Sequence, residues 1–371
     1  MRKVKKQKKF SIKKTIRLII PLFIIIILLV NKNRITYFYL SKTTGYSEDS
    51  IAVFLEKDLY KDIKDKKYSE NLEKIIKTEY YNPTYIDEYI NITYQDKANF
   101  FININKLLDL GYKANDINNL YLKLDDNDIS LLTNSDYIED ITNIINLSYF
   151  KKENLERYIN YYKKDKENAI VYVNIGLDNE YYSNVFKIDN QDDLLVLVNK
   201  YHYLEKDYVP SDLEKVNSKY QWMGRSNMLR KDARIAFEDM CEAASKDNIY
   251  IYAGSGYRSY NTQLSLYNNY VKRDGFKEAE TYSARAGYSE HQTGLAMDIA
   301  NSTGFISSGD KEYTWLLDNS YKYGFILRYP KDKEYVTGYM NEEWHYRYVG
   351  KDTAKIVFDK GITYDEYMAM K

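Results

Sequence analysis

The 371-residue chain has little cysteine, proline or histidine and no excess of charge of either sign. Its single cysteine, Cys241, excludes an intramolecular disulfide framework and any zinc module built mainly from cysteine. Lys plus Arg and Asp plus Glu both number 54, whereas a general nucleic-acid-binding protein carries a basic excess. Hydrophobic residues make up 44% of the chain, which is enough to bury the cores of about two or three domains. The composition therefore predicts a globular protein with no nucleic-acid partner.

The N-terminal 30 residues combine a basic segment, 1–17, with an uninterrupted apolar run, 18–30. As a helix this run would span roughly 20 Å, short of the hydrocarbon core of about 30 Å. It fits a cleaved signal peptide or an uncleaved signal anchor better than a buried core helix, which would not follow so many lysines. We expect the anchor, because no small-residue cleavage site follows. The predicted location is the cell membrane, single-pass, with 1–17 in the cytoplasm and the rest of the chain outside it.

Residues 31–165 are predicted to form a mostly helical region, because apolar residues recur there at three- and four-residue spacings. Gly45-Tyr46 recurs as Gly111-Tyr112, and the pattern of 75–91 recurs as 144–160. These recurrences indicate two duplicated helical hairpins, or else chance similarity in a chain rich in Ile, Tyr and Asn. The region contains no cluster of catalytic residue types, and its partner is unknown.

The remaining chain mixes helical and extended stretches. Residues 166–210 are predicted to be a connecting segment with β-structure, since 169–177 alternate and are β-branched. Residues 211–371 form the last predicted domain, and their mixed order with few parallel crossovers favours an α+β fold. Helices are expected over 226–246, 260–272, 275–282 and 311–323, and strands over 249–253, 293–299, 325–329 and 344–349.

Two of the three histidines lie beside acidic residues in this last domain. His291 precedes Asp298 by seven residues, and His345 follows Glu342 by three. Two imidazoles and one carboxylate with an open fourth position form a common catalytic zinc arrangement. A nearby carboxylate that does not bind the metal can then act as general base. Such spacings also arise between structural residues, so spacing alone leaves both interpretations open.

The strings around these residues are more specific. SGYRSYNTQ (255–263), YSARAGYSEHQTGLAMDI (282–299) and EEWHYRYVG (342–350) closely resemble the VanY-type D-alanyl-D-alanine carboxypeptidases, in the family's order. These enzymes belong to the LAS group of zinc peptidases, with lysostaphin and Sonic hedgehog as relatives in fold. The resemblance covers roughly 195–371. It implies a zinc carboxypeptidase domain of the hedgehog/D-Ala-D-Ala peptidase type, after the helical region and the membrane anchor.

The resemblance also implies roles for individual residues. It implies one zinc ion held by His291, Asp298 and His345, with Glu342 as catalytic base and Arg258, Gln263 and Ser289 as substrate contacts. Arg258 could instead only brace its loop. Glu343 stands where many members have proline, which leaves a choice of base, and the spacing to His345 favours Glu342. Glu290 and Glu343 are expected to be solvated or to support the ligands from behind.

The implied activity is removal of the C-terminal D-alanine from peptidoglycan stem peptides, so the expected partners are the stem peptide and, through the N-terminus, the membrane. Two alternatives stay open. One is an L,D-carboxypeptidase acting on stem tetrapeptides, and the other is a non-catalytic wall-binding or scaffold protein that works through its helical region. Another divalent ion could also occupy the site in a purified sample.

Overall fold

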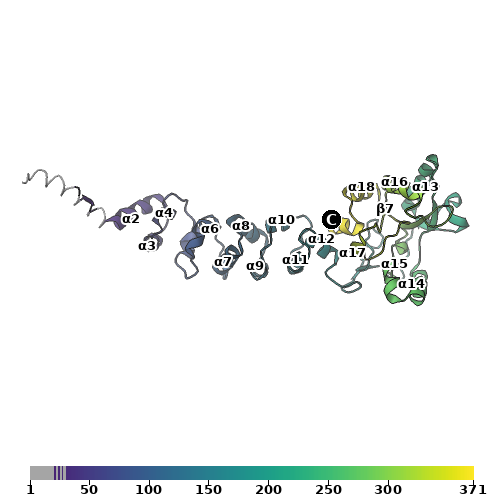
Figure 1. The fold of residues 1–371 in the computed structure, drawn as a ribbon. Coiled ribbons are helices and arrows are strands. Elements are labelled where there is room, and N and C mark those ends of the chain that lie inside the picture. Colours follow the sequence, from purple (N-terminus) through teal and green to yellow (C-terminus); the bar gives the residue numbers. More distant parts are fainter. Residues whose placement is uncertain (1–20, 22–23, 26, 28–30) are drawn as a thin grey trace, which may run out of the picture. The chain divides into compact units, whose positions relative to one another are not determined.

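The computed structural model describes residue 21, residues 24–25, residue 27 and residues 31–371 (Figure 1). The chain divides into two compact units, Met1–Leu147 and Ser148–Lys371. The domain limits predicted at 165 and 210 stay predictions. The predicted mixture of a helical region and a C-terminal domain containing a sheet is confirmed.

The first unit is helical where it is described, as its apolar spacings predict. Each helix buries one face, and Ile51, Leu72 and Ile104 are fully buried. Ser47 caps α3, because its side chain accepts a hydrogen bond from the Ser50 amide. The helices are α2 (Lys32–Thr43), α3 (Glu48–Glu56), α4 (Tyr60–Ile63), α5 (Glu70–Ile75), α6 (Ile86–Asn91), α7 (Phe100–Leu110), α8 (Ala114–Lys123), α9 (Asp126–Thr133) and α10 (Ile141–Ile144).

The predicted membrane segment, 18–30, lies mostly outside the described residues. Among the residues that are described, no helix is both long and apolar enough to cross a membrane. The helix that begins directly after this segment, α2, has 12 residues and includes Lys32, Arg34 and Lys42. This finding contradicts the prediction of a single-pass membrane protein, which we correct here.

Two helical stretches make equivalent hydrogen bonds 69 residues apart. In the first unit, Tyr89 donates to Oδ1 of Asn105. In the second unit, Tyr158 of α11 (Leu155–Tyr162) donates to Oδ1 of Asn174 at 2.6 Å. In both stretches the asparagine Nδ2 donates to a backbone carbonyl 25 residues earlier in the chain. These shared bonds favour a duplicated helical unit over chance similarity.

The strand predicted over 169–177 is wrong, because these residues form helix α12 (Ala169–Ile175). Five of its seven residues are buried, so its apolar positions reflect burial on several sides of a helix. A short apolar run of this kind does not distinguish a buried strand from a buried helix. The strands of the connecting segment are the two-residue pair β1 (Phe186–Lys187) and β2 (His202–Tyr203).

The second unit is built around a four-stranded antiparallel sheet with the order β5-β6-β8-β7. Its strands are β5 (Tyr252–Ser255), β6 (Ala296–Ala300), β8 (His345–Tyr348) and β7 (Phe325–Leu327). A second sheet pairs β3 (Leu213–Lys215) with β4 (Met228–Arg230). The helix expected over 226–246 therefore begins later than predicted, after β4, as α13 (Lys231–Lys246).

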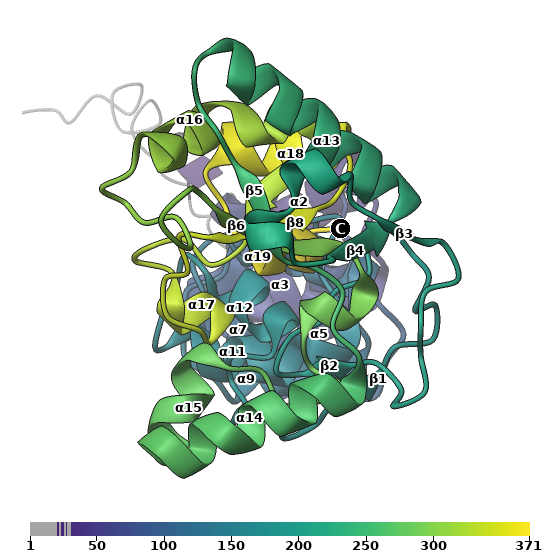
Figure 2. The same cartoon turned by 90° about the vertical axis from the view of Figure 1, so that its right-hand side faces the viewer.

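Helices cover the central sheet from opposite sides, as the two views together show (Figures 1 and 2). One side carries α13, α16 (Lys311–Asn319) and α18 (Lys351–Lys360), and the other carries α14 (Tyr260–Asp274) and α15 (Phe276–Tyr282). Phe237 and Met240 of α13 pack with Ile299 and Phe325 of the sheet in the main core. Two short α-helices of this unit are α17 (Glu334–Thr337) and α19 (Tyr364–Ala369).

Candidate functional site

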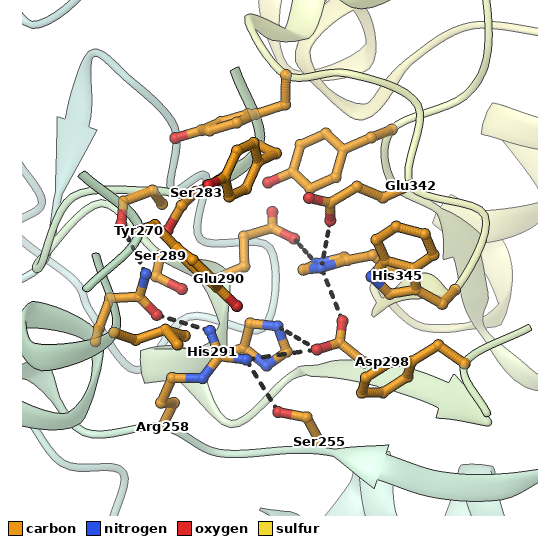
Figure 3. Close-up of a pocket in the computed structure, with 18 of the residues that line it drawn as sticks. Ser255, Arg258, Tyr270, Ser283, Ser289, Glu290, His291, Asp298, Glu342 and His345 are labelled. Carbon is orange, nitrogen blue, oxygen red and sulfur yellow. Dashed lines mark hydrogen bonds and ion pairs between the residues drawn. The ribbon is translucent and has the colours of Figure 1, made fainter. Parts of the chain in front are cut away.

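The three predicted metal ligands meet on the central sheet (Figure 3). His291 lies in the short 3-10 helix Glu290–Thr293, Asp298 lies within β6, and His345 is the first residue of β8. Asp298 and His345 are direct partners in the antiparallel register. Gly294 ends the 3-10 helix with φ +67°, and a Cβ there would lie 2.7 Å from Leu213. A glycine is therefore needed where the chain turns from His291 into β6.

The ligand atoms are close enough to share one metal ion. His291 Nε2 lies 3.3 Å from Asp298 Oδ2, and His345 Nδ1 lies 3.2 Å from Asp298 Oδ1. All three side chains are buried, and their ligand atoms lie within 4.8 Å of one another. Metal–ligand bonds of about 2.0–2.1 Å place tetrahedral ligands roughly 3.4 Å apart. Asp298 Oδ1 is also buried without a hydrogen bond in the described part of the chain, as expected for an atom that binds a cation.

The ring of His291 is oriented by the backbone. Its Nδ1 lies 2.8 Å from the carbonyl oxygen of Gly256, so a proton on Nδ1 leaves the lone pair of Nε2 directed toward Asp298. Gly256 must be glycine, because a Cβ there would lie 2.4 Å from the carbonyl oxygen of Met228. The tight turn after β5 therefore fixes which nitrogen of His291 is available for the metal.

Burial and neighbouring charges favour the metal-binding protonation states of His291 and Asp298, whereas His345 differs: burial lowers its pKa, but Asp298, Glu290 and Glu342 raise it well above its usual value. Burial and the adjacent Arg258 guanidinium lower the pKa of His291, so its neutral form is favoured. Burial alone would raise the pKa of Asp298, but His291 and His345 hold it well below its usual range. A neutral imidazole and an ionised carboxylate are the binding forms of these residues.

The adjacent residues Glu342 and Glu343 make different contacts near the predicted metal ligands. Glu342 is 8% exposed, and its Oε2 lies 3.3 Å from Nδ1 of His345. Burial raises the pKa of Glu342, as expected for a carboxyl group that exchanges protons near neutral pH. Glu343 instead accepts a hydrogen bond of 2.6 Å from the Ser308 amide and so holds the neighbouring loop. The geometry favours Glu342 as the candidate base.

Arg258 and Gln263 form a pair inside the protein. Nη1 of Arg258 donates to Oε1 of Gln263 at 2.7 Å, and Nη2 donates to Oγ of Ser255 at 3.0 Å. The amide of Gln263 donates in turn to the carbonyl oxygen of Ala284 at 2.7 Å. Nη2 of Arg258 also lies 3.4 Å from Asp298. The guanidinium is therefore held rigidly beside the ligand cluster, with Gln263 and Ser255 fixing its orientation.

Comparison with known proteins identifies the family. The family model described as VanY, D-alanyl-D-alanine carboxypeptidase, matches residues 226–351. The protein YodJ of Bacillus subtilis (strain 168), named as a carboxypeptidase, is 41% identical over 205 residues, which cover 52% of this chain and 75% of YodJ. A D-alanyl-D-alanine carboxypeptidase of Enterococcus faecalis (strain ATCC 700802 / V583) is 40% identical over 191 residues, which cover 48% of this chain and 67% of that protein. The chain belongs to the VanY family.

Among solved structures that the chain matches is the LD-carboxypeptidase LdcB, at 41% identity and a TM-score of 0.47 over 50% of this chain and 90% of LdcB. Another is VanYB in complex with D-alanine-D-alanine, at 37% identity and a TM-score of 0.41 over 47% of this chain and 96% of VanYB.

All seven predicted site residues line one cavity of about 570 Å³ in this VanY-family domain. Their roles stay predictions. Trp344, which the resemblance to the family places as a wall of the site, also lines the cavity. The sequence analysis missed the aromatic residues Tyr270, Phe305, Tyr329 and Tyr339 and two further arginines of the lining, Arg225 and Arg273. In a chain with 42 tyrosines, composition gives no signal that would single out the aromatic residues of a pocket.

A buried ion cluster behind His345 was also missed. Glu290 is 1% exposed, so it is not solvated, and Arg328 and Arg347 donate to its Oε1 at 2.8 and 3.0 Å. Both arginines are fully buried. A signal for this cluster does exist in the sequence, because each arginine lies in an apolar strand segment, FILRY or WHYRYV. A buried cation in such a segment requires a buried anion.

Proposed function

We propose that the second unit is a zinc-dependent carboxypeptidase that removes the C-terminal D-alanine from peptidoglycan stem peptides. The observation that carries the proposal is the buried cluster of His291, Asp298 and His345, which shares one cavity with Glu342 and Arg258. Membership in the VanY family supports the reaction, and the activity named for the relatives supports D-alanyl-D-alanine as the substrate. The intact metal ligand set disfavours a purely scaffolding role.

His291 Nε2, His345 Nδ1 and the carboxylate of Asp298 are the groups that would hold the ion. When bound, zinc supplies a Lewis acid that polarises a carbonyl group and makes water more acidic. Glu342 then takes a proton from the attacking water and delivers it to the leaving amine of D-alanine. Burial raises the pKa of Glu342 toward the working pH, which suits a group that both accepts and donates this proton.

Arg258 recognises the end of the peptide in this proposal. A planar guanidinium pairs well with the terminal carboxylate of a substrate or with the oxyanion that develops at the attacked carbonyl. Gln263 holds Arg258 through Nη1, so its contribution to substrate binding includes fixing the guanidinium. Ser289 is 3% exposed and lines the same cavity, within reach of a bound peptide.

The test uses the full chain loaded with zinc. The substrates are a stem pentapeptide ending in D-Ala-D-Ala, the matching tetrapeptide ending in one D-Ala, and a pentapeptide ending in L-Ala-L-Ala. Mass spectrometry should show loss of one alanine from the D-Ala-D-Ala peptide, abolished by a chelator and restored by zinc. Cleavage of the tetrapeptide alone would replace the proposal with an L,D-carboxypeptidase. No cleavage by a zinc-loaded chain would overturn the catalytic assignment.

A further inference from the structure

The ion cluster behind His345 contains four buried charges that balance one another. Glu290 accepts hydrogen bonds from Arg328 and Arg347, and Arg328 Nη1 also donates to Asp365 Oδ2 at 2.6 Å. The side chains of all four are at most 1% exposed. Two carboxylates and two guanidiniums sum to no net charge, so each ion is compensated inside the protein.

The two carboxylate oxygens of Glu290 have different surroundings. Oε1 accepts from both arginines, whereas Oε2 lies 3.5 Å from Nε2 of His345 (Figure 3). Both Oε2 and this Nε2 are buried, and neither has a hydrogen bond to any other described residue. Buried polar atoms nearly always have partners, and one hydrogen bond from Nε2–H of His345 to Oε2 of Glu290 would satisfy both of these atoms at once. The Arg328 and Arg347 guanidiniums, 2.8 and 3.0 Å from Oε1, compensate the charge of an anionic Glu290 carboxylate.

We propose that Glu290 is a positioning residue of the metal site: its Oε2 accepts a hydrogen bond from Nε2–H of His345, which keeps the proton on Nε2 and leaves the Nδ1 lone pair for the metal. This inference rests on the proposed function, because it needs a metal ion between His291, Asp298 and His345. Nδ1 already faces Asp298 Oδ1 at 3.2 Å. Metal-binding histidines usually donate their second N–H to a carboxylate or a carbonyl oxygen, which fixes the tautomer and makes the ligand more basic.

The two histidines are therefore oriented by different means. His291 uses the carbonyl oxygen of Gly256 and binds through Nε2, whereas His345 uses a compensated carboxylate and binds through Nδ1. A carboxylate oxygen is a stronger hydrogen-bond acceptor than a neutral carbonyl oxygen, so it raises the electron density on the ligand nitrogen more. The Glu290 cluster thus contributes to metal affinity through one ligand of the three.

The support for His345 extends on both sides of the residues matched by the family model, 226–351. Asp365 of α19 pairs with Arg328 and accepts from Asn199 Nδ2 at 2.9 Å. Arg347 Nη2 donates to the carbonyl oxygens of Leu194 and Val196 at 3.1 and 2.8 Å. The segment 194–199 and α19 therefore hold the two arginines that fix Glu290. We expect a fragment limited to 226–351 to lose this orientation.

Nitrogen-15 NMR of histidine in the zinc-loaded full chain tests the assignment without any substitution. The chain has three histidines, and His202 bonds through Nδ1 to Asn199, so its signal should not respond to removal of zinc. The expected result is one zinc-bound ring protonated on Nε2, for His345, and one protonated on Nδ1, for His291. Two zinc-bound rings that are both protonated on Nδ1 would overturn the role of Glu290.

Zinc affinity, measured by competition with a chromophoric chelator, gives a second readout. Glu290→Gln keeps the shape of the side chain but loses its charge, and we expect zinc binding to weaken about 10–100-fold. Glu343→Gln is the matched control, because the side chain of Glu343 accepts hydrogen bonds from the Ser308 amide and from Asn341, which are not predicted metal ligands. An unchanged affinity of a folded Glu290→Gln protein would overturn the inference.

If Glu290→Gln does not fold, the NMR measurement on the unchanged chain still tests whether His345 binds zinc through Nδ1, as the role of Glu290 requires. Neither readout depends on peptide cleavage, so the two proposals fail separately. If the chain binds no zinc, the metal site of the proposed function is wrong. If it binds zinc through Nε2 of His345, only the role of Glu290 is wrong.

Discussion

The two units bury polar side chains of different kinds. Where the first unit is described, five of its six buried polar residues are uncharged, namely Thr44, Ser50, Ser69, Asn71 and Asn103, with Asp128 as the charged one. The second unit buries ionisable groups in and behind its cavity, including Lys200, Glu290, His291, Asp298, Arg328, Glu342, His345, Arg347 and Asp365.

This difference separates what holds a fold from what performs chemistry. A buried amide or hydroxyl needs only one or two hydrogen bonds, which neighbouring helices supply. Burying an ion costs on the order of several kcal/mol of solvation free energy. A buried ion is therefore stable only where an opposite charge or a metal compensates it. In the second unit, five of these buried groups line one cavity, namely Glu290, His291, Asp298, Glu342 and His345.

The largest expected effect is a loss of activity when the candidate base Glu342 is replaced. Glu342→Gln should lower kcat by about 10²–10⁴-fold, because the water would lose its general base. Zinc content, measured by atomic emission after dialysis, should remain at the level of the unchanged chain. Glu343→Gln is the control and should keep most of its activity. Comparable losses in the two variants would show that position 342 has no special role.

A smaller but still large effect is expected from breaking the ion cluster. Arg328→Met leaves Glu290 and Asp365 undercompensated and should lower the free energy of unfolding by about 3–5 kcal/mol. All three tryptophans, Trp222, Trp315 and Trp344, lie in the second unit, so their fluorescence reports its unfolding in denaturant.

The matched variant removes one charge of each sign. The double variant Arg328→Met/Asp365→Leu keeps the cluster neutral, so it should lose less stability than Arg328→Met alone. If the double variant is instead the less stable of the two, compensation of charge is not what stabilises the cluster.

Lys200 tests a buried charge of another type. Its Nζ donates to the Glu280 carbonyl oxygen at 2.8 Å and lies 4.5 Å from the ring centroid of Tyr181 and 4.6 Å from that of Tyr339. Burial lowers its pKa to about 8, against about 10.4 in an unfolded chain. Between these pH values the unfolded chain keeps a proton that the folded chain has released. Stability should therefore rise with pH across this window.

The measurement compares the unchanged chain with Lys200→Met. From pH 8 to pH 10.4 the free energy of unfolding of the unchanged chain should gain about 3 kcal/mol relative to the variant. The difference removes the contributions of the tyrosines, which titrate in both proteins. A constant difference across the window would show that Lys200 has an ordinary pKa.

The smallest expected effects concern the two equivalent asparagines. Asn105→Ala and Asn174→Ala each remove bonds to a tyrosine hydroxyl and a carbonyl oxygen and should destabilise their surroundings by about 1–3 kcal/mol. Asn174 also donates to the Ala369 carbonyl oxygen at 3.1 Å. Hydrogen exchange should accelerate over 80–110 in the first variant, and over 149–175 together with α19 in the second. Unchanged exchange in α19 would contradict a role of Asn174 at this contact.

The seven site residues predicted from the sequence all line the cavity, and they could be found because they lie in three distinctive strings. The spacings of His291 to Asp298 and of Glu342 to His345 suggested a metal site but left it open, and the flanking residues favoured it over a structural role. The ion cluster was not predicted, because its members lie far apart in the chain: Arg328 is 38 residues from Glu290 and 37 from Asp365. Only the sheet and α19 make them neighbours.

Helix α12 at 169–175 was predicted as a strand for a local reason. Ile, Val and Tyr favour strands, and five of the seven residues of α12 are buried, so neither propensity nor alternation distinguishes the two structures. The equivalence of Asn174 with Asn105 in α7 carried the information, but it becomes visible only through the hydrogen bonds that the two residues share.

The neutrality of the cluster formed by Glu290, Arg328, Arg347 and Asp365 has a consequence for how this domain can evolve. Any single replacement that removes one charge leaves an uncompensated ion in the interior, so the intermediate sequence is disfavoured before a second change can correct it. Descendants of this protein should therefore inherit the four residues together or lose them in opposite-sign pairs. Their codons form one linked unit of selection although they are spread over 76 positions of the chain.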